Sequence, residues 1–268
     1  MHVQQFAPPD YLKEYVRYFW LLESAGDNAR MKTFRMIADG YPGLIFQQPE
    51  YPLFQDETHA QWPRAFLYGQ TTASGDIYAP GSFKTLGVYF HPSALPAVFG
   101  FDADELTNSC LDLNLLTAPL FEQLVNTEPV GQQIELLSTF LFALIQKNKA
   151  VISQDIQYSL RQMHTTGGGV SLLSLQESLR MSERSFQRKF KQHVGISPKL
   201  FSRICRFQVS LNQLRSRQYR KLSDVAFEND YADQSHYIRS FQEFAGCSPY
   251  QYQKQVKELV ENFPLIIQ

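Results

Sequence analysis

Two hydrophobic patterns divide the chain, and the first is a series of short apolar runs broken by glycine and proline. Each run is rich in β-branched and aromatic residues and predicts a strand: Lys32–Ile37, Leu44–Phe46, Ala65–Tyr68, Ile77–Ala79 and Thr85–Phe90. An earlier run, Tyr15–Leu22, fits a strand or a helix equally well. Several short strands with regular turns predict a sandwich or a small barrel, whose mouth is a natural ligand pocket.

Helical spacing replaces this pattern after Pro92. Helices are predicted at Leu95–Phe99, Leu115–Val125 and Gly131–Lys147. The last of these carries an apolar stripe made of Ile134, Leu137, Leu141, Leu144 and Ile145, which Phe140 and Phe142 widen. Two explanations stay open: the stripe packs on the β-region, or it forms a seam between two chains.

The second hydrophobic pattern occurs twice in the carboxy-terminal half. Shifting the sequence by 51 positions places Phe186, Phe190, Gly195, Ser197, Pro198 and Phe201 on Tyr237, Phe241, Gly246, Ser248, Pro249 and Tyr252. A repeat of this kind is one supersecondary unit present twice. Each copy predicts a short helix, a turn, a second helix capped by Ser182 or Asp233, and a further helix opened by Ser-Pro. Two helix-turn-helix units in tandem indicate binding to DNA.

The second helix of the first unit, Glu183–Gln192, is the predicted reading helix, with Phe186 and Phe190 on its buried side. Its opposite side carries the predicted DNA contacts at helical spacing: Arg184, Gln187, Arg188 and Lys191. Arginine can bind guanine and glutamine can bind adenine in the major groove, whereas lysine suits phosphates. The alternative is an ordinary solvated, charged helix surface.

The second unit predicts a less basic reading helix that buries Tyr237 and Phe241. Its outward residues, and predicted DNA contacts, are Gln234, Ser235, His236 and Arg239. With fewer cations, this helix is expected to hold DNA less strongly than the first. His236 also fits a surface or capping role.

A stiff connector joins the two units. Pro198–Ser216 carries a buried stripe, so we expect one long helix that fixes the separation of the reading helices. To enter the major groove from one side of the duplex, these helices must lie roughly 34 Å apart. Gly167-Gly168-Gly169 resembles a linker, but the apolar stripe of Asp155–His164 before it predicts a loop inside the DNA-binding domain.

Charge is unevenly divided between the halves. Residues 153–258 hold 16 Lys and Arg against 9 Asp and Glu, a net charge of +7, whereas residues 1–152 hold 9 against 16, a net charge of −7. Such asymmetry is typical of a chain in which one half meets a polyanion. The three cysteines form no disulfide or CxxC pattern, and no signal peptide or membrane span is predicted. We therefore expect a cytoplasmic protein.

The carboxy-terminal residues resemble a known family. Asp224–Tyr252, and Leu175–Phe201 before it, resemble the DNA-binding domain of AraC/XylS transcription regulators over about residues 153–258. The resemblance implies that the outward residues named above meet DNA. Asp230 replaces the glycine that this family has after the supporting helix, where a left-handed conformation is comfortable.

The amino-terminal residues resemble an uncharacterised, cupin-like domain found ahead of such DNA-binding domains. The resemblance lies in Asp39-Gly40, Leu44–Phe46, Phe66–Gln70 and Gly87–Pro92. By analogy this domain senses a small molecule or mediates pairing. The candidate ligand-binding residues are aromatic groups and one cation: Trp20, Arg35, Trp62, Tyr68 and Tyr89. The alternative is that they are ordinary core and surface residues.

No catalytic pattern is present, so no enzyme and no cofactor is predicted. The available metal ligands, Glu50, Asp56, His59 and His91, lack HxH or HExxH spacing, and no metal site is predicted. GxSxG, Walker and dinucleotide-binding motifs are also lacking.

Together these features predict an α+β protein with three parts. Residues 1–150 form a β-rich, cupin-like or barrel domain with a helical extension, residues 151–260 an all-α domain with two helix-turn-helix units, and residues 261–268 a tail. The predicted function is a ligand-responsive transcription regulator with double-stranded promoter DNA, a small effector and a second copy as partners. The alternative is a small-molecule-binding or catalytic amino-terminal domain that the other half recruits to DNA.

Overall fold

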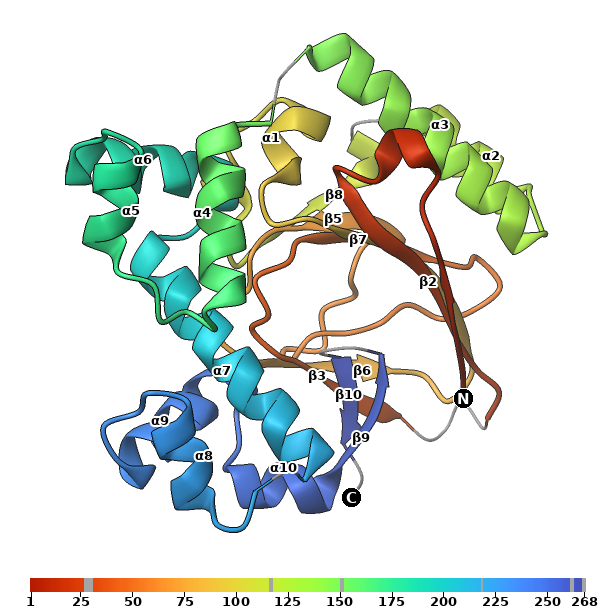
Figure 1. The fold of residues 1–268 in the computed structure, drawn as a ribbon. Coiled ribbons are helices and arrows are strands. Elements are labelled where there is room, and N and C mark those ends of the chain that lie inside the picture. The colour runs from red at the N-terminus through yellow and green to blue at the C-terminus, as the bar shows by residue number, and fades with distance from the viewer. Residues whose placement is uncertain (27–30, 116–117, 150–151, 218, 261–262, 267–268) are drawn as a thin grey trace.

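Two antiparallel sheets form the amino-terminal part of the structure (Figure 1). The computed structural model describes residues 1–26, 31–115, 118–149, 152–217, 219–260 and 263–266. The larger sheet consists, in spatial order, of β1 (His2–Phe6), β2 (Val16–Ser24), β7 (Phe83–Phe90), β4 (Gly43–Gln47), β5 (Ala65–Tyr68) and β8 (Cys110–Asp112). The smaller sheet consists of β6 (Gly75–Ala79), β3 (Lys32–Met36), β10 (Phe263–Ile266) and β9 (Val256–Val260). Every strand predicted between residues 31 and 90 is confirmed within two residues at each end.

The larger sheet is buried on both sides because it is the middle of three layers. Side chains alternate across a strand, so Ile45 joins the aromatic core between the sheets, while Leu44 and Phe46 join a second core under helices. These helices are α1 (Ala94–Phe99), α2 (Ala118–Val125) and α3 (Val130–Asn148). Three short 3₁₀ helices complete the domain: η1 (Asp10–Leu12), η2 (Ala103–Leu106) and η3 (Leu113–Leu115).

The ambiguous segment Tyr15–Leu22 is a strand. It lies almost entirely within β2, which pairs with β1 on one side and β7 on the other. Pairing on both sides satisfies the backbone hydrogen bonds of a run whose side chains are apolar in both directions.

Helix α3 packs on the larger sheet through the predicted stripe. Leu137, Leu141 and Ile145 are buried in the core that the helices share with that sheet. Phe142 stays 38% exposed, with its ring edge-on to that of Tyr11. The packing explanation is therefore confirmed for the stripe, and the wider part of the helix surface remains open to solvent.

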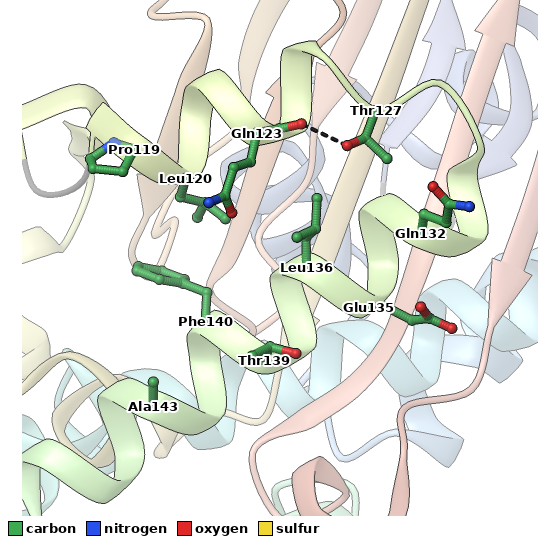
Figure 2. Close-up of a pocket in the computed structure, with 10 residues that line it drawn as sticks. All are labelled: Pro119, Leu120, Gln123, Thr127, Gln132, Glu135, Leu136, Thr139, Phe140 and Ala143. Carbon is green, nitrogen blue, oxygen red and sulfur yellow. Dashed lines mark hydrogen bonds between the residues drawn. The ribbon is translucent and has the colours of Figure 1, made fainter.

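A groove of about 610 Å³ separates α2 from α3. Figure 2 shows Leu120 and Phe140 on its two sides, with Leu136 pointing toward α2. Thr127 closes the turn between the helices, because its hydroxyl donates to the carbonyl oxygen of Gln123 at 2.7 Å. This groove is the accessible apolar surface of the helical extension.

The described residues of the carboxy-terminal domain form seven helices. They are α4 (Gln154–Thr165), α5 (Leu172–Ser178), α6 (Glu183–Val194), α7 (Pro198–Ser216), α8 (Leu222–Glu228), α9 (Gln234–Ala245) and α10 (Pro249–Gln255). The predicted connector is confirmed as the single helix α7, whose buried side includes Phe201, Phe207 and Leu214. In Figure 1, α6 and α9 lie on one side of the molecule, and α9 packs on the middle of α7 through Phe241, Phe244 and Phe207.

The repeated caps form as predicted. Ser182 accepts a hydrogen bond from the backbone N–H of Ser185 at 3.3 Å, and Asp233 accepts one from that of His236 at 2.7 Å. Gly195 and Gly246 end α6 and α9 with left-handed φ angles of 96° and 69°. Asp230 also adopts a left-handed φ, of 54°.

The three glycines after α4 belong to a tight turn packed on α7. Gly168 has a φ of +81°, and a Cβ atom there would lie 2.0 Å from the carbonyl oxygen of Ser202. Only glycine allows this approach. The turn thus joins α4 to the rest of the helical domain, as predicted from the stripe in Asp155–His164.

The chain returns to the amino-terminal domain at its end. Strands β9 and β10 form a hairpin whose second strand pairs with β3, with Leu265 opposite Phe34. The sequence assigns residues up to 260 to the all-α domain and residues 261–268 to a tail, so the strands β9 and β10 differ from this prediction. Residues 261–262 and 267–268 of that tail lie outside the described part of the chain.

Candidate nucleic-acid interface

The predicted contacts of the first unit share one exposed side of α6. Arg184, Gln187, Arg188 and Lys191 are all exposed, while Phe186 and Phe190 on the other side are fully buried. The four polar residues also line one open groove of about 720 Å³, together with Ser182, Glu183 and Ser197. The structure therefore brings together the complete predicted set of the first unit.

Glu183 orients one member of this set. The Gln187 side-chain amide donates to the Glu183 carboxylate at 2.8 Å, one helical turn away. Glu183 is not among the predicted DNA contacts, although its spacing of four residues from Gln187 is the signal for such a contact.

The second unit presents a less charged surface. Gln234, Ser235 and Arg239 are exposed on α9, while Tyr237 and Phe241 are fully buried. Among these exposed residues Arg239 alone carries a charge. The difference in cation content between the reading helices therefore persists on the folded surface.

His236 takes part in the turn before α9. Its Nδ1 accepts a hydrogen bond from the backbone N–H of Ala232 at 3.3 Å, and the Tyr231 ring packs edge-on against it. This is the capping role that the sequence left open. The acceptor at Nδ1 leaves the proton of the neutral imidazole on Nε2.

The amino-terminal domain contacts the carboxy-terminal end of α6 through η2. Lys191 Nζ lies 3.3 Å from the Asp104 carboxylate, and the Gln192 amide donates to Asp102 at 3.3 Å. The hydroxyl of Thr107 donates to the carbonyl oxygen of Gly195 at 2.7 Å. A predicted phosphate contact, Lys191, is thus paired with an acid of the other domain, and no local sequence pattern predicts this pair.

The second unit is held mainly by backbone groups. The Ala38 backbone N–H donates to the Phe244 carbonyl oxygen at 3.2 Å, and the Gln208 amide donates to the Ala38 carbonyl oxygen at 2.8 Å. Ile37 and Ala38 are buried in the core of the helical domain. Both helix-turn-helix units are therefore attached to the amino-terminal domain, each by a different contact.

Most of the candidate ligand-binding residues lie together between the two sheets. Trp20 and Tyr89 are buried there, with Trp62 and Tyr68 packed at the margin of the same aromatic core. Burial raises the pKa of the Tyr68 hydroxyl far above its ordinary value.

Two glycines make room for these rings. A Cβ atom at Gly87 would lie 2.0 Å from the Trp20 ring, and one at Gly43 would lie 2.3 Å from the Tyr68 hydroxyl. Aromatic side chains thus fill the space over both glycines.

Arg35 lies apart from these aromatic residues. Its guanidinium forms a salt bridge with Asp76 at 2.7 Å, and this hydrogen bond raises the Arg35 pKa. The side chain also approaches Gly246, at the end of α9. Strand alternation explains the separation, because Phe34 beside it is the residue of β3 that enters the aromatic core.

The candidate metal ligands show no clustering. Within the described residues, no group of three or more His, Cys, Asp or Glu side chains is arranged to hold a metal ion. The Asp56 carboxylate instead accepts hydrogen bonds from Thr58 and Ala60 in its own turn. The same described segments contain no helix that is both long and apolar enough to cross a membrane.

Two family descriptions match successive parts of the chain. Residues 4–112 match a domain of unknown function (DUF6597), and residues 175–255 match a helix-turn-helix domain. The second match covers both repeated units described above. Residues 175–255 are therefore similar to helix-turn-helix domains of the AraC type.

Known relatives carry related descriptions. An "Uncharacterized HTH-type transcriptional regulator" of Haemophilus influenzae is 28% identical over 167 residues, which cover 54% of this chain and 56% of the relative. The chain thus spans about half the length of the curated relative it matches. The chain is also similar to the crystal structure of ToxT from Vibrio cholerae O395, with 11% identity, a TM-score of 0.44 and coverage of 90% and 97% of the two chains. For unsaturated fatty acid bound ToxT from strain SCE256, the identity is 11%, the TM-score 0.45, and the coverage 87% and 94%.

Proposed function

We propose that this protein is a sequence-specific, DNA-binding transcription regulator in which α6 and α9 enter two adjacent major grooves of promoter DNA. It acts on DNA in the compartment that holds the chromosome, the cytoplasm. Regulation rather than catalysis is its role.

The observation that carries this proposal is the shared exposed side of α6. Two arginines, a glutamine and a lysine line one groove on a helix whose other side is fully buried. Such a helix offers guanine- and adenine-binding groups together with a phosphate contact. The second unit repeats the geometry with Arg239 as its exposed cation.

Mapping of bound chromosomal fragments, followed by titration of the enriched sequence, tests the proposal. Full-length protein should bind that duplex at least about 10³-fold more tightly than an unrelated duplex at the same salt concentration. Arg188→Ala should lose much of this preference. Lys147→Ala on α3 removes the same charge far along the chain from the reading helices and serves as the matched control. Equal binding to related and unrelated duplexes would contradict sequence-specific regulation.

Small-molecule control is part of the proposal. The amino-terminal domain contacts both helix-turn-helix units, so a compound that binds it can change how they are presented to DNA. A change in promoter affinity on addition of an effector supports this role. Turnover of a compound by the full chain would favour the alternative, a catalytic domain recruited to DNA.

Pairing of two chains through the α2–α3 groove completes the proposal. Leu120, Leu136 and Phe140 give this groove an apolar lining. Phe140→Ser should therefore lower the dimer fraction measured by analytical ultracentrifugation, while Phe142→Ser on the neighbouring exposed surface should have a smaller effect. A wild-type chain that stays monomeric at all concentrations would contradict the pairing.

A further inference from the structure

A cavity lies between the amino-terminal domain and α4, beside the aromatic core that holds most of the predicted ligand-binding residues. Its volume of about 550 Å³ lies within the range of small-molecule sites. Lining residues from the amino-terminal domain include Glu14, Tyr41 and His91, and those from α4 include Gln157, Arg161 and His164. In Figure 1, α4 stands at the edge of the helical domain that faces the sheets. An occupant of this cavity would contact both domains at once.

The two domains contribute opposite charges to the cavity. Glu14 lies on the amino-terminal side and Arg161 on the α4 side, and both are exposed. The ion pairs found among the described residues include neither of them. The cavity therefore offers one carboxylate and one guanidinium that are available to a ligand.

The remaining polar lining is largely neutral. Burial lowers the pKa of His91, and burial together with the charge of Arg17 lowers the pKa of His164, so both imidazoles are uncharged at neutral pH. His91 Nε2 lies 3.2 Å from the carbonyl oxygen of Lys13 and donates to it. Gln157 adds an amide that can donate and accept. One negative and one positive group thus stand out against neutral hydrogen-bonding partners.

We propose that this cavity binds a free α-amino acid, whose ammonium group pairs with Glu14 and whose carboxylate pairs with Arg161. The assignment rests on the proposed regulator function and names the class of its effector. A zwitterion pairs with the charges on both walls of the cavity, whereas a simple anion or a simple cation leaves one of these two charges unpaired. Because each charge of the ligand meets a different domain, binding stabilises the arrangement in which the two domains face each other.

A continuous series of rings connects the cavity to the first reading helix. The Tyr41 ring stacks on the His164 ring, with the ring centroids 5.9 Å apart. The His164 ring packs edge-on to that of Phe201 in α7, with the ring centroids 5.4 Å apart. Phe201 contacts Phe190, which contacts Phe186, both within α6. An occupant beside Tyr41 and His164 therefore acts on side chains that support the reading helix. We expect it to change promoter affinity by about fivefold or more.

Calorimetric titration of the full-length protein with each proteinogenic amino acid tests the assignment. At least one should bind with a Kd below about 10 mM, which corresponds to weak but measurable affinity. Its N-acetyl and carboxamide derivatives each lack one charge, and each should bind at least about tenfold more weakly. Glu14→Gln and Arg161→Gln should produce comparable losses. Glu50→Gln and Lys147→Gln, which change exposed charges outside the cavity, serve as matched controls.

The outcomes separate the site from the function on which it rests. Failure of every amino acid to bind, or binding that survives both Glu14→Gln and Arg161→Gln, overturns the assignment. Promoter titrations of the same variants without amino acid should equal wild type, which shows that they are folded and bind DNA. If wild-type protein has no DNA specificity, the regulator function fails, whether or not an amino acid binds.

Discussion

The two helix-turn-helix units are alike in backbone and unlike in charge. Helices α6 and α9 each have 12 residues, a side-chain cap at the start and a left-handed glycine at the end. The outward side of α6 nevertheless carries two arginines and a lysine, whereas that of α9 carries Arg239 among neutral groups. A repeated fold thus supplies the same geometry twice, and the exposed residues decide how strongly each copy can hold a polyanion.

Their attachments to the amino-terminal domain also differ. The first unit meets η2 through side-chain contacts between unlike groups, among them Lys191 and Asp104. The second unit meets the Ile37–Ala38 segment through one backbone hydrogen bond and burial, and the chain beyond it adds β10 to β3. A contact built from charges depends on salt and competes with DNA phosphates, whereas a backbone and apolar contact does not. We therefore expect salt and DNA to weaken the contact between the first unit and the amino-terminal domain more than the contact of the second unit.

Replacement of the corresponding arginine in each unit should give the largest difference in promoter affinity between the two units. Arg188→Ala should lower promoter affinity by about 1–3 kcal/mol and relax the preference at one base pair. Arg239→Ala should lower promoter affinity by a smaller amount, because α9 is expected to hold DNA less strongly than α6. Fluorescence anisotropy with the mapped promoter at one fixed salt concentration measures both. Equal losses would show that the units contribute equally despite their charges.

The ion pair between Lys191 and Asp104 should restrain DNA binding modestly. Asp104→Asn frees the lysine, and because exposed ion pairs are worth about 0–1 kcal/mol, promoter affinity should rise by up to about fivefold. Lys191→Ala should weaken binding to all DNA sequences by a similar factor. It should also reduce the slope of log affinity against log salt concentration by about one.

A double-mutant cycle separates pairing from a general change of charge. In the Lys191→Ala background, Asp104→Asn should have little further effect. Asp10→Asn removes an equal charge from an exposed pair with Lys13 at 2.6 Å and is the control. An equal rise from Asp10→Asn would contradict the specific role of η2.

Backbone strain at the turns of the two units should differ by a smaller amount. Arg180 and Asp230 hold equivalent left-handed positions, with φ angles of 53° and 54°. Glycine removes the strain but adds freedom to the unfolded chain, and aspartate tolerates this conformation better than arginine. Arg180→Gly should therefore raise the free energy of unfolding by about 0.5–1 kcal/mol, and Asp230→Gly by less than about 0.5 kcal/mol. Urea denaturation checks the order, and the reverse order would contradict this explanation.

The first unit should contribute to the pH dependence of stability through His193. Burial lowers the pKa of His193, in the last turn of α6, whereas α9 has no histidine in its last turn. As pH falls, His193 of the unfolded chain takes up a proton near its ordinary pKa of 6.5. In the folded chain the same imidazole takes up a proton only at lower pH. Stability is therefore present above that pH and is lost as pH falls further.

Thermal unfolding of wild type between about pH 7 and about pH 5 measures this loss. His193→Gln should reduce the pH dependence. A variant with the same pH dependence as wild type would contradict this explanation.

The local parts of the fold could be predicted because their causes are local. Caps such as Ser182 and Asp233, the Ser-Pro steps and the buried stripe of α7 act within a few residues, so the helices of the repeat follow from their spacing. The β2 segment was ambiguous because its run is apolar on both sides. Its conformation was decided by pairing with β1 and β7.

The amino-acid sequence by itself determined the repeat and its helices, the side of α6 that faces outward and the division of charge. Tertiary structure alone decided that Asp104 meets Lys191, that Arg35 lies apart from the aromatic residues, that β9 and β10 extend the sheet of β3, and that Glu14 and Arg161 share a cavity. These contacts join residues far apart in the chain. They depend on how whole layers pack, and that packing is a property of the assembled cores rather than of any local pattern.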